Sequence, residues 1–320
     1  MNNQICEKLG IRYPIIQGPM AWASDSKLAA SVSNAGGLGI MGLGFCPPEV
    51  VVKEIHLAQA MTNAPFGFNI ITALPIANKL LEICLSENVK VIELETSPDF
   101  FNTIPYYVDK LKSHGVTTIG KVSSVEEAIF FKSAGIDFIS VKGSDGGGHI
   151  FDFTGTFSLI PQVADAVSIP VINSSGIADR RGVAASFMLG ASGVEIGSRF
   201  LLAEECPVHI NYKNAIISAK EGDTVLTGVC ASDGVRGIRN HLTDEMLRLE
   251  REFPLADACE HIRELGKGSL HKAAVEGDIV NGSVVVGQNV GLLNAILPAS
   301  EIMLEFIAGY EHVSQWDSAH

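Results

Sequence analysis

Short apolar runs alternate with longer amphipathic segments between residues 13 and 200. The runs with the length and composition of buried strands are 13–20, 38–43, 66–71, 89–94, 117–122, 138–141, 170–173 and 193–196. The segments with helical spacing are 26–35, 47–61, 76–87, 99–114, one that opens at Ser124, 157–167 and 178–189. Ser124-Val125-Glu126-Glu127 has the spacing of a capping box. Eight strands that recur about every 25 residues, with helices between them, pair in parallel. The pattern therefore predicts an α/β fold, a closed (β/α)8 TIM barrel.

A doubly wound open sheet is the alternative arrangement. That fold would place a G-x-G-x-x-G fingerprint after its first strand, whereas Gly18-Pro19-Met20 stands there. Beyond Phe200 the alternation ends, and the chain becomes more polar and largely helical, with a glycine-rich interruption from 266 to 291. We expect residues 1–204 and part of the C-terminal tail to form the barrel, and residues from about 205 to 320 to form a helical cap that lines the substrate site.

Composition and charge narrow the classes of function. Hydrophobic residues make up 47% of the 320 residues and charged residues 18%, a balance typical of a well-packed globule. The net charge of −13 argues against nucleic acid and anionic membranes as partners. Six scattered cysteines without a C-x-x-C pair argue against a disulfide framework or structural zinc. The N-terminal residues lack a basic stretch followed by a long apolar one, so we expect a cytoplasmic protein.

The stretch Asp145-Gly146-Gly147-Gly148-His149 follows the sixth predicted strand. Successive glycines permit positive φ and allow a flat or anionic ligand to approach the main chain closely. An imidazole with a pKa of about 6.5 can act as a general acid or base. The stretch therefore predicts a ligand site with His149 as its catalytic group. A surface turn that carries a solvated histidine is the alternative.

In a parallel barrel, the loops after the strands form the active site, and phosphate commonly binds after strands seven and eight. Those loops read Asn173-Ser174-Ser175-Gly176-Ile177-Ala178-Asp179 and Gly197-Ser198-Arg199, so both combine glycine with hydroxyl groups. Both also lead toward helix starts, where free N–H groups and the helix dipole favour an anion. These two loops therefore predict a phosphate site.

Other polar side chains follow the first, third and fifth predicted strands. Gln17 and Asn69 carry amides that could hydrogen-bond the edge of a heteroaromatic ring, and Lys121 could stabilise charge on a reduced ring. Alternatively, both amides cap strand ends, and Lys121 pairs with Glu95 or another barrel carboxylate. No nucleophile elbow with a Ser-His-Asp set is visible, which indicates that a cofactor supplies the reactivity.

Several motifs in order resemble the FMN-dependent family that joins nitronate monooxygenases with bacterial enoyl-acyl-carrier-protein reductase II. They are the stretches 13–20, 33–39, 65–69, 147–149, 176–179, 197–200 and 282–292. The resemblance implies that FMN binds and that His149 is the catalytic histidine. The cofactor contacts it implies are Gly18, Met20, Asn69, Gly147, Gly148, Gly176, Gly197 and Ser198. Further candidate contacts to the cofactor are Pro19, Lys121, Ser175 and Gln288.

The two branches of that family leave the reaction open. Gln17-Gly18-Pro19-Met20 is similar to the monooxygenases, whereas Trp22 and the tail 268–283 look more like the reductases. Glu95 stands where the reductases carry a glycine-rich loop, so Trp22 and Glu95 are candidate substrate contacts. Ser174-Ser175 is a second departure, because small Ala or Gly residues usually occupy that place.

Three functions are compatible with these motifs. The first is NAD(P)H-dependent reduction of an activated alkene such as an enoyl thioester, either free or carried on acyl carrier protein. The second is oxidation of alkyl nitronates with O2, which needs no nicotinamide. The third is a barrel that binds a phosphorylated ligand without turnover. A homodimer is an open expectation for the assembly.

Overall fold

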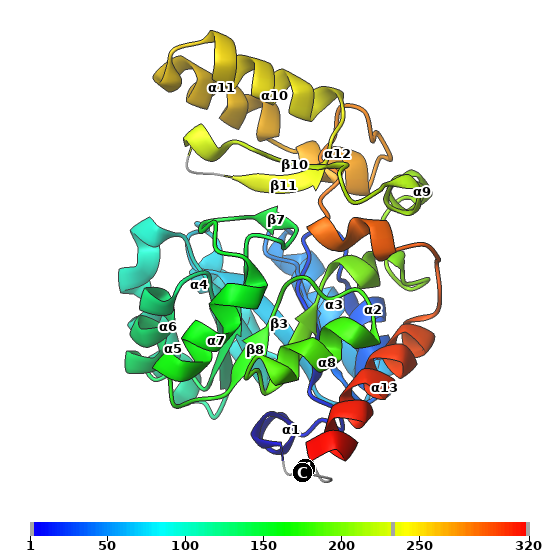
Figure 1. The fold of residues 1–320 in the computed structure, drawn as a ribbon. Helices are drawn as coiled ribbons and strands as arrows, with labels where there is room; N and C mark the ends of the chain where they lie inside the picture. Colours follow the sequence, from blue (N-terminus) through cyan, green and yellow to red (C-terminus); the bar gives the residue numbers. More distant parts are fainter. Residues whose placement is uncertain (1–2, 232–233, 318–320) are drawn as a thin grey trace.

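The computed structural model describes residues 3–231 and 234–317, and in it eight parallel strands close into a barrel (Figure 1). The strands are β1 (Ile15–Gln17), β2 (Leu38–Met41), β3 (Phe66–Ile71), β4 (Val91–Glu95), β5 (Thr117–Val122), β6 (Phe138–Val141), β8 (Val171–Asn173) and β9 (Gly193–Ile196). Closure occurs at β1, where Ile16 lies opposite Leu38 on one side and Glu195 on the other. The predicted (β/α)8 barrel is therefore confirmed.

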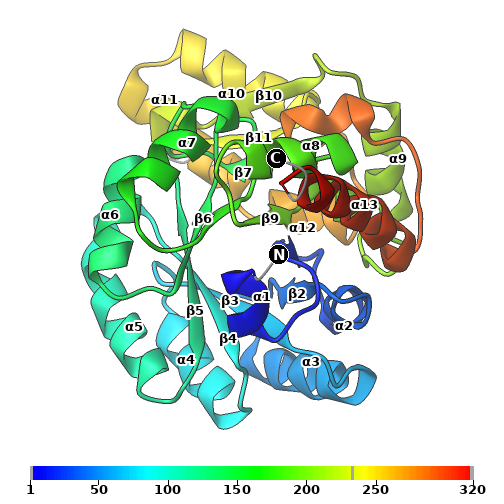
Figure 2. The same cartoon turned by 60° about the horizontal axis from the view of Figure 1, so that its bottom comes forward.

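Helices surround the barrel and shield the outer faces of its strands. They are α2 (Ser26–Asn34), α3 (Pro48–Met61), α4 (Ala77–Ser86), α5 (Ile104–Lys112), α6 (Val125–Ser133), α7 (Thr156–Ala166) and α8 (Arg180–Met188). Helix α13 (Ala299–Asp317) returns from the far end of the molecule and packs against α8 and α2 (Figure 2). It therefore takes the place of the eighth barrel helix. Among the described residues, no helix has both the length and the apolar character needed to cross a bilayer.

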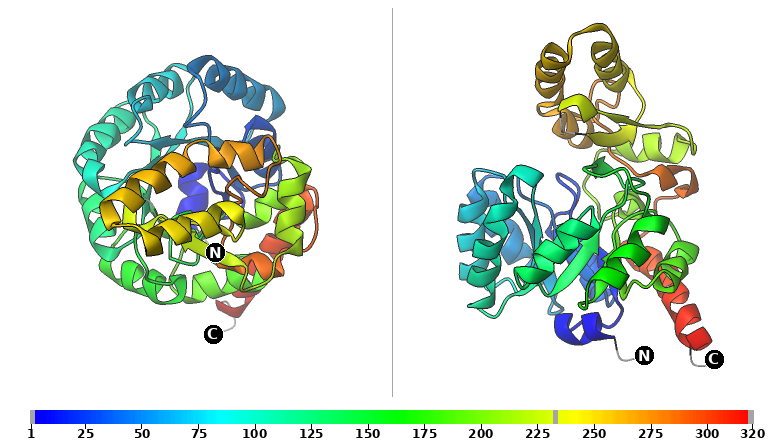
Figure 3. Two further views of the ribbon diagram at one scale, coloured as in Figure 1. Left: turned by 90° about the horizontal axis from the view of Figure 1, so that it is seen from above. Right: turned by 60° about the vertical axis from the view of Figure 1, so that its left-hand side comes forward.

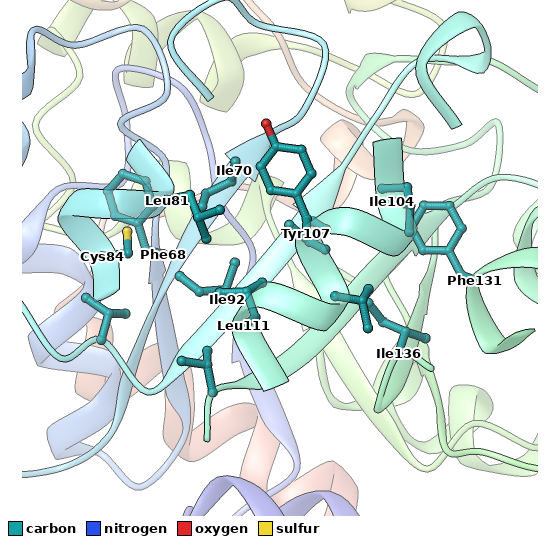
Figure 4. Packing of buried hydrophobic residues seen from close by; sticks show 14 of the residues in the cluster. Phe68, Ile70, Leu81, Cys84, Ile92, Ile104, Tyr107, Leu111, Phe131 and Ile136 are labelled. Atoms are coloured by element: carbon teal, nitrogen blue, oxygen red, sulfur yellow. The ribbon is translucent and has the colours of Figure 1, made fainter. Parts of the chain in front are cut away.

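Apolar side chains fill the layer between strands and helices (Figure 4). Phe68 of β3 and Ile92 of β4 are fully buried against Leu81 of α4 and Leu111 of α5. Burial of each such side chain contributes about 1.5–3 kcal/mol. Elsewhere the layer is thinner, because a Cβ added at Gly39 would collide with the backbone of Ala29. Glycine therefore allows α2 to pack directly on β2.

The short helix α1 (Gln4–Leu9) closes the amino end of the barrel (Figure 2). Its Ile5 and Leu9 pack against inward-facing strand residues, including Phe138. Lys8 Nζ lies 2.5 Å from Asp137 Oδ1, and Thr118 donates to Asp137 Oδ2 from its backbone N–H at 2.8 Å and its hydroxyl at 3.0 Å. The Asp137 carboxylate therefore joins α1, the plug at the amino end of the barrel, to β5 and β6.

Two local predictions differ from the structure. The single helix predicted at 99–114 is a 3-10 helix η1 (Pro98–Thr103) followed by α5, because Pro105 has no N–H to continue a helical ladder from the preceding turn. The predicted capping box forms only in part. Ser124 accepts from Glu127 N at 3.1 Å, but the Glu127 carboxylate accepts from Ser123 N instead of from Ser124 N.

The segment between β9 and α13 forms the cap, which lies across the carboxyl end of the barrel (Figure 3). Its helices are α9 (Ile210–Ser218), α10 (His241–Glu252), α11 (Leu255–Gly266) and α12 (Ser269–Ala274), and its 3-10 helices are η2 (Ser198–Leu202), η3 (Val229–Ala231) and η4 (Gln288–Leu292). The prediction of a largely helical segment is confirmed, and the cap also contains a hairpin of β10 (Thr224–Thr227) and β11 (Val235–Ile238) that was not predicted. The glycine loop joins this sheet as β7 (Gly148–His149).

We predict that Asp137→Asn weakens the plug at the amino end of the barrel. Burial raises the pKa of Asp137, but hydrogen bonds from Lys8 and Thr118 outweigh it, so the pKa is lowered. The contribution of this carboxylate is therefore complete above its unfolded pKa and is lost as pH falls through the folded pKa. We expect Asp137→Asn to lower the free energy of unfolding by about 1.5–3 kcal/mol in urea at pH 7.

Lys8→Ala is the matched control for this substitution. Lys8 is half exposed, so its removal is expected to cost less than about 1 kcal/mol. Equal losses in the two variants would contradict the central role of the Asp137 carboxylate.

Candidate active site

A cavity of about 570 Å³ opens at the carboxyl ends of the barrel strands and continues between them and the cap. The loops after β1, β3, β4, β6, β8 and β9 line its floor, and β11, α10, α11 and α12 contribute residues to its upper part. The volume falls within the range of sites that enclose a cofactor or small ligand, about 300–1,000 Å³. The side chains that the sequence assigns to separate loops therefore share one space.

The structure brings together the predicted site residues with one exception. The residues that line the cavity are Gly18, Pro19, Met20, Trp22, Asn69, Glu95, Lys121, Gly147, Gly148, His149, Ser175, Gly176, Gly197 and Ser198. Gln288 does not line it: its side chain is exposed, and its backbone N–H donates to Asp145 O at 2.9 Å. The adjacent Gly287 and Asn289 face the cavity instead. The prediction of a cofactor contact at Gln288 is thus not supported.

The glycine loop is held by the cap. Its His149 lies opposite Val235 and its Gly148 lies opposite Arg236 in the sheet with β11. A Cβ at Gly147 would lie 2.7 Å from the carbonyl carbon of Val286, so a side chain does not fit at that position. Backbone pairing on one side and close packing on the other fix the position of the His149 backbone. His149 therefore belongs to a strand and not to a turn, and it lines the cavity with an exposed side chain.

The loop after β1 is strained at Trp22, which has a φ of +63°. For a residue other than glycine this conformation costs about 1–2 kcal/mol. The indole meets the His271 ring of α12 edge to face, with centroids 4.7 Å apart. Nearby, Gly18 leaves room for a buried carboxylate, since a Cβ there would lie 2.5 Å from Glu195 Oε1. Trp22 thus links the barrel rim to the cap beside the cavity.

The two predicted phosphate loops differ in which of their groups remain available to bind an anion. At the start of α8, the Asp179 carboxylate already accepts from Arg181 N at 2.8 Å, so its negative charge opposes an anion at this helix end. Gly176, with a φ of +74°, turns the preceding loop along the cavity. At Gly197 and Ser198, η2 begins without a side-chain cap from the described part of the chain. Of these two loops, the backbone near Gly176, Gly197 and Ser198 is therefore the part that remains available to an anion.

A cluster of buried charges lies at the bottom of the cavity. Lys121 Nζ is 2.5 Å from Glu195 Oε1 and 2.9 Å from Glu93 Oε1. The Ser140 and Ser174 hydroxyls donate to the two Glu195 oxygens at 2.6 and 3.0 Å. The alternative that Lys121 pairs with barrel carboxylates is confirmed, although its partners are Glu93 and Glu195 rather than Glu95. Sequence reasoning missed Glu93 and Glu195 as a pair, and their signal was a glutamate inside each of two apolar strands.

The pKa values of the three members of this cluster are shifted by burial and by one another. Burial raises the pKa of Glu93, and the adjacent Glu195 raises it further. Burial also disfavours the charge on Glu195, but Lys121 outweighs this effect and lowers the pKa of Glu195. Burial alone would lower the pKa of Lys121, but Glu195 and Glu93 raise it. Glu93 therefore keeps its proton to a higher pH than Glu195, and Glu195 is the main anion that faces Lys121.

We predict that Glu93→Gln and Glu195→Gln differ strongly in stability, although both replace a buried carboxyl group by an amide. Burial and Glu195 disfavour the charge on Glu93, so Glu93→Gln should change the free energy of unfolding by less than about 1 kcal/mol. Glu195→Gln leaves the buried Lys121 ammonium without its closest anion and should cost about 3–5 kcal/mol. Urea unfolding at pH 7 measures both, and similar losses would contradict the role of Glu195 as the main anion of Lys121.

Comparison with known proteins places the whole chain in one group. The family model described as nitronate monooxygenase matches residues 2–309. A protein of Staphylococcus aureus (strain JH9) named "Probable nitronate monooxygenase" is 34% identical over 98% of this chain and 99% of its own length.

Solved structures resemble the chain over the same extent. FabK from Thermotoga maritima is 36% identical, with a TM-score of 0.92 over 100% of this chain and 99% of its own. Nitroalkane oxidase from Streptomyces ansochromogenes is 25% identical, with a TM-score of 0.80 over 95% of this chain and 97% of its own. The chain therefore belongs to the nitronate monooxygenase family and is a flavin-type oxidoreductase.

Proposed function

We propose that the protein binds FMN and catalyses the NAD(P)H-dependent reduction of an activated alkene such as an enoyl thioester. The observation that carries this proposal is the similarity to FabK, which extends over the cap as well as the barrel and exceeds the similarity to nitroalkane oxidase. The upper part of the cavity also suits an acyl chain, because Met246, Ile262 and Leu270 of the cap line it.

The residues around the cavity fit FMN. The backbone at Gly176, Gly197 and Ser198 would hold the phosphate, and the loop Gly18–Met20 would lie along the ring. Within the described part of the chain, the Asn69 amide donates to Glu93 at long distances of 3.4 and 3.5 Å, so it can still donate to a ring edge. When bound, FMN would supply hydride transfer between a nicotinamide and the acceptor.

The chain's own groups would position the acceptor and control its proton. His149, held by β11, would place or deliver a proton at the α-carbon of the acceptor. Trp22 and His271 close one side of the space between barrel and cap, where they would exclude water from the reacting atoms. Glu95 would face the acceptor from the end of β4.

Nitronate oxidation is the second candidate function, and the family model and the name of the Staphylococcus aureus relative favour it. In this reaction His149 would take the α-proton of a nitroalkane or position its nitronate. No nicotinamide would be needed. A barrel that binds a phosphorylated ligand without turnover is the third candidate, and a colourless protein that cannot be reconstituted with FMN would favour it.

An anaerobic stopped-flow experiment separates these functions. The purified protein is mixed with NADH, NADPH or ethylnitronate while the visible absorbance of the oxidised flavin is followed. We expect bleaching by one of the nicotinamides, and reoxidation when crotonoyl-CoA is added. Bleaching by ethylnitronate with no response to either nicotinamide would overturn the reductase proposal and support the monooxygenase.

We predict that His149→Ala lowers the turnover number by about 10²–10⁴-fold, because a positioned acid or base is lost from the cavity. Steady-state kinetics measures the loss, and fluorescence titration should show that the Kd for FMN is unchanged. The control is His114→Ala, since His114 is exposed at the end of α5 and lies outside the cavity. Unchanged turnover in His149→Ala would reject a catalytic role for this residue.

A further inference from the structure

A second lysine faces the cavity beside the glycine loop. Lys142 directly follows β6, and its backbone N–H donates to Val122 O at 2.8 Å, which anchors it at the end of β5. A Cβ added at Gly146 would lie 3.3 Å from Lys142 Cε, and one added at Gly148 would lie 3.5 Å from Lys142 Nζ. The ammonium group therefore lies against the glycine that precedes His149, in space that the glycines leave open.

Lys121 and Lys142 both line the cavity, but their charges are compensated differently. Lys121 has two carboxylate oxygens within 2.9 Å. Lys142 Nζ forms neither an ion pair nor a hydrogen bond with any residue in the ranges 3–231 and 234–317. Lys121, which the sequence analysis assigned to the ligand, is thus already paired with carboxylates of the protein. Lys142, which the sequence analysis did not assign, remains available to a ligand.

The surroundings of Lys142 favour the binding of a ligand to its ammonium group. Burial lowers the pKa of Lys142, Glu95 is the main group that opposes this effect, and Lys121 adds to it. Glu195 and Glu93 oppose it more weakly and are already paired with Lys121. A poorly solvated ammonium costs free energy until it meets an anion or a hydrogen-bond acceptor. An oxygen atom placed next to the glycine loop would supply both.

We propose that Lys142 is the ligand-binding cation of this cavity, and that its ammonium donates to a carbonyl, nitro or phosphate-type oxygen of the molecule bound beside His149. Where that molecule is the acceptor, the inference deepens the proposed function and rests on it. For an enoyl thioester, the Lys142 ammonium then polarises the thioester carbonyl and withdraws electron density from the β-carbon that accepts hydride. For a nitronate, the ammonium pairs with a negatively charged oxygen and holds the substrate in place.

The same contact could instead be made to FMN, whose carbonyl, hydroxyl and phosphate oxygens offer the same chemistry. In that case Lys142 contributes to holding the cofactor and not the acceptor. FMN and the acceptor would both place an electron-rich oxygen within reach of Lys142 Nζ. The two cases differ in whether the dissociation constant of FMN or that of the acceptor depends on the charge of Lys142.

The test compares Lys142→Met, which keeps the length of the side chain and removes its charge, with the wild-type holoenzyme. Three dissociation constants are measured anaerobically: FMN by fluorescence quenching, and crotonoyl-CoA and ethylnitronate by perturbation of the flavin spectrum. We expect one of them to increase by about 10- to 150-fold, the loss typical of a hydrogen bond to a charged group. A change for FMN identifies the cofactor as the partner, and a change for either acceptor identifies the substrate.

The matched control is Lys79→Met on α4, where the lysine is exposed and lies 3.8 Å from Glu82. It should leave all three constants within about twofold. If Lys142→Met has a wild-type urea midpoint and changes none of the three constants, the proposal is overturned. Failure of the proposed function is seen separately, as wild-type protein that reduces no enoyl thioester with NADH or NADPH.

Discussion

Barrel closure through β1 is the constraint on which the rest of the structure depends. This strand covers only Ile15–Gln17, yet it pairs with β2 on one side and with β9 on the other. Closure in parallel register places the carboxyl ends of all eight strands at the same mouth. Residues as far apart in sequence as Gly18 and Ser198 therefore line one cavity. The amino end is filled by α1, so ligands have access from the cap side alone within the described structure.

The barrel interior also sets the electrostatics of that cavity. Strand stagger brings Glu93 of β4, Lys121 of β5 and Glu195 of β9 together below the ligand space. The cluster has little net charge when Glu93 is protonated, so it can be buried without a counter-ion from solvent. Because Lys121 is paired there, the electrostatic character of the mouth depends on the other charged residues that line it, among them Lys142, Glu95 and Asp145. Two lysines, one on β5 and one directly after β6, thus have different surroundings.

Much of the barrel could be predicted from the sequence, because each strand is specified by a short run of neighbouring residues. The bounds of β3, β5, β6 and β9 match the predicted runs, since each is an apolar segment between polar or glycine-containing turns. Their order then placed the glycine loop and the phosphate loops at the mouth. The cap sheet was missed for two reasons. Its strands β10 and β11 contain only four residues each. In addition, β11 pairs with β7, which lies more than 80 residues earlier in the sequence. The partners of Lys121 could not be predicted either, as they depend on barrel stagger.

The position of α13 has a consequence for how the protein is made. This helix covers α2 and α8, but its first residue, Ala299, is synthesised about 100 residues after β9 has ended. During translation the barrel strands, both phosphate loops and the whole cap leave the ribosome before the outer layer can be completed. Until then, apolar groups such as Phe200, which packs on Phe306 in the finished protein, lack their cover. The nascent chain therefore exposes an apolar surface over that interval, which is when a chaperone would bind it.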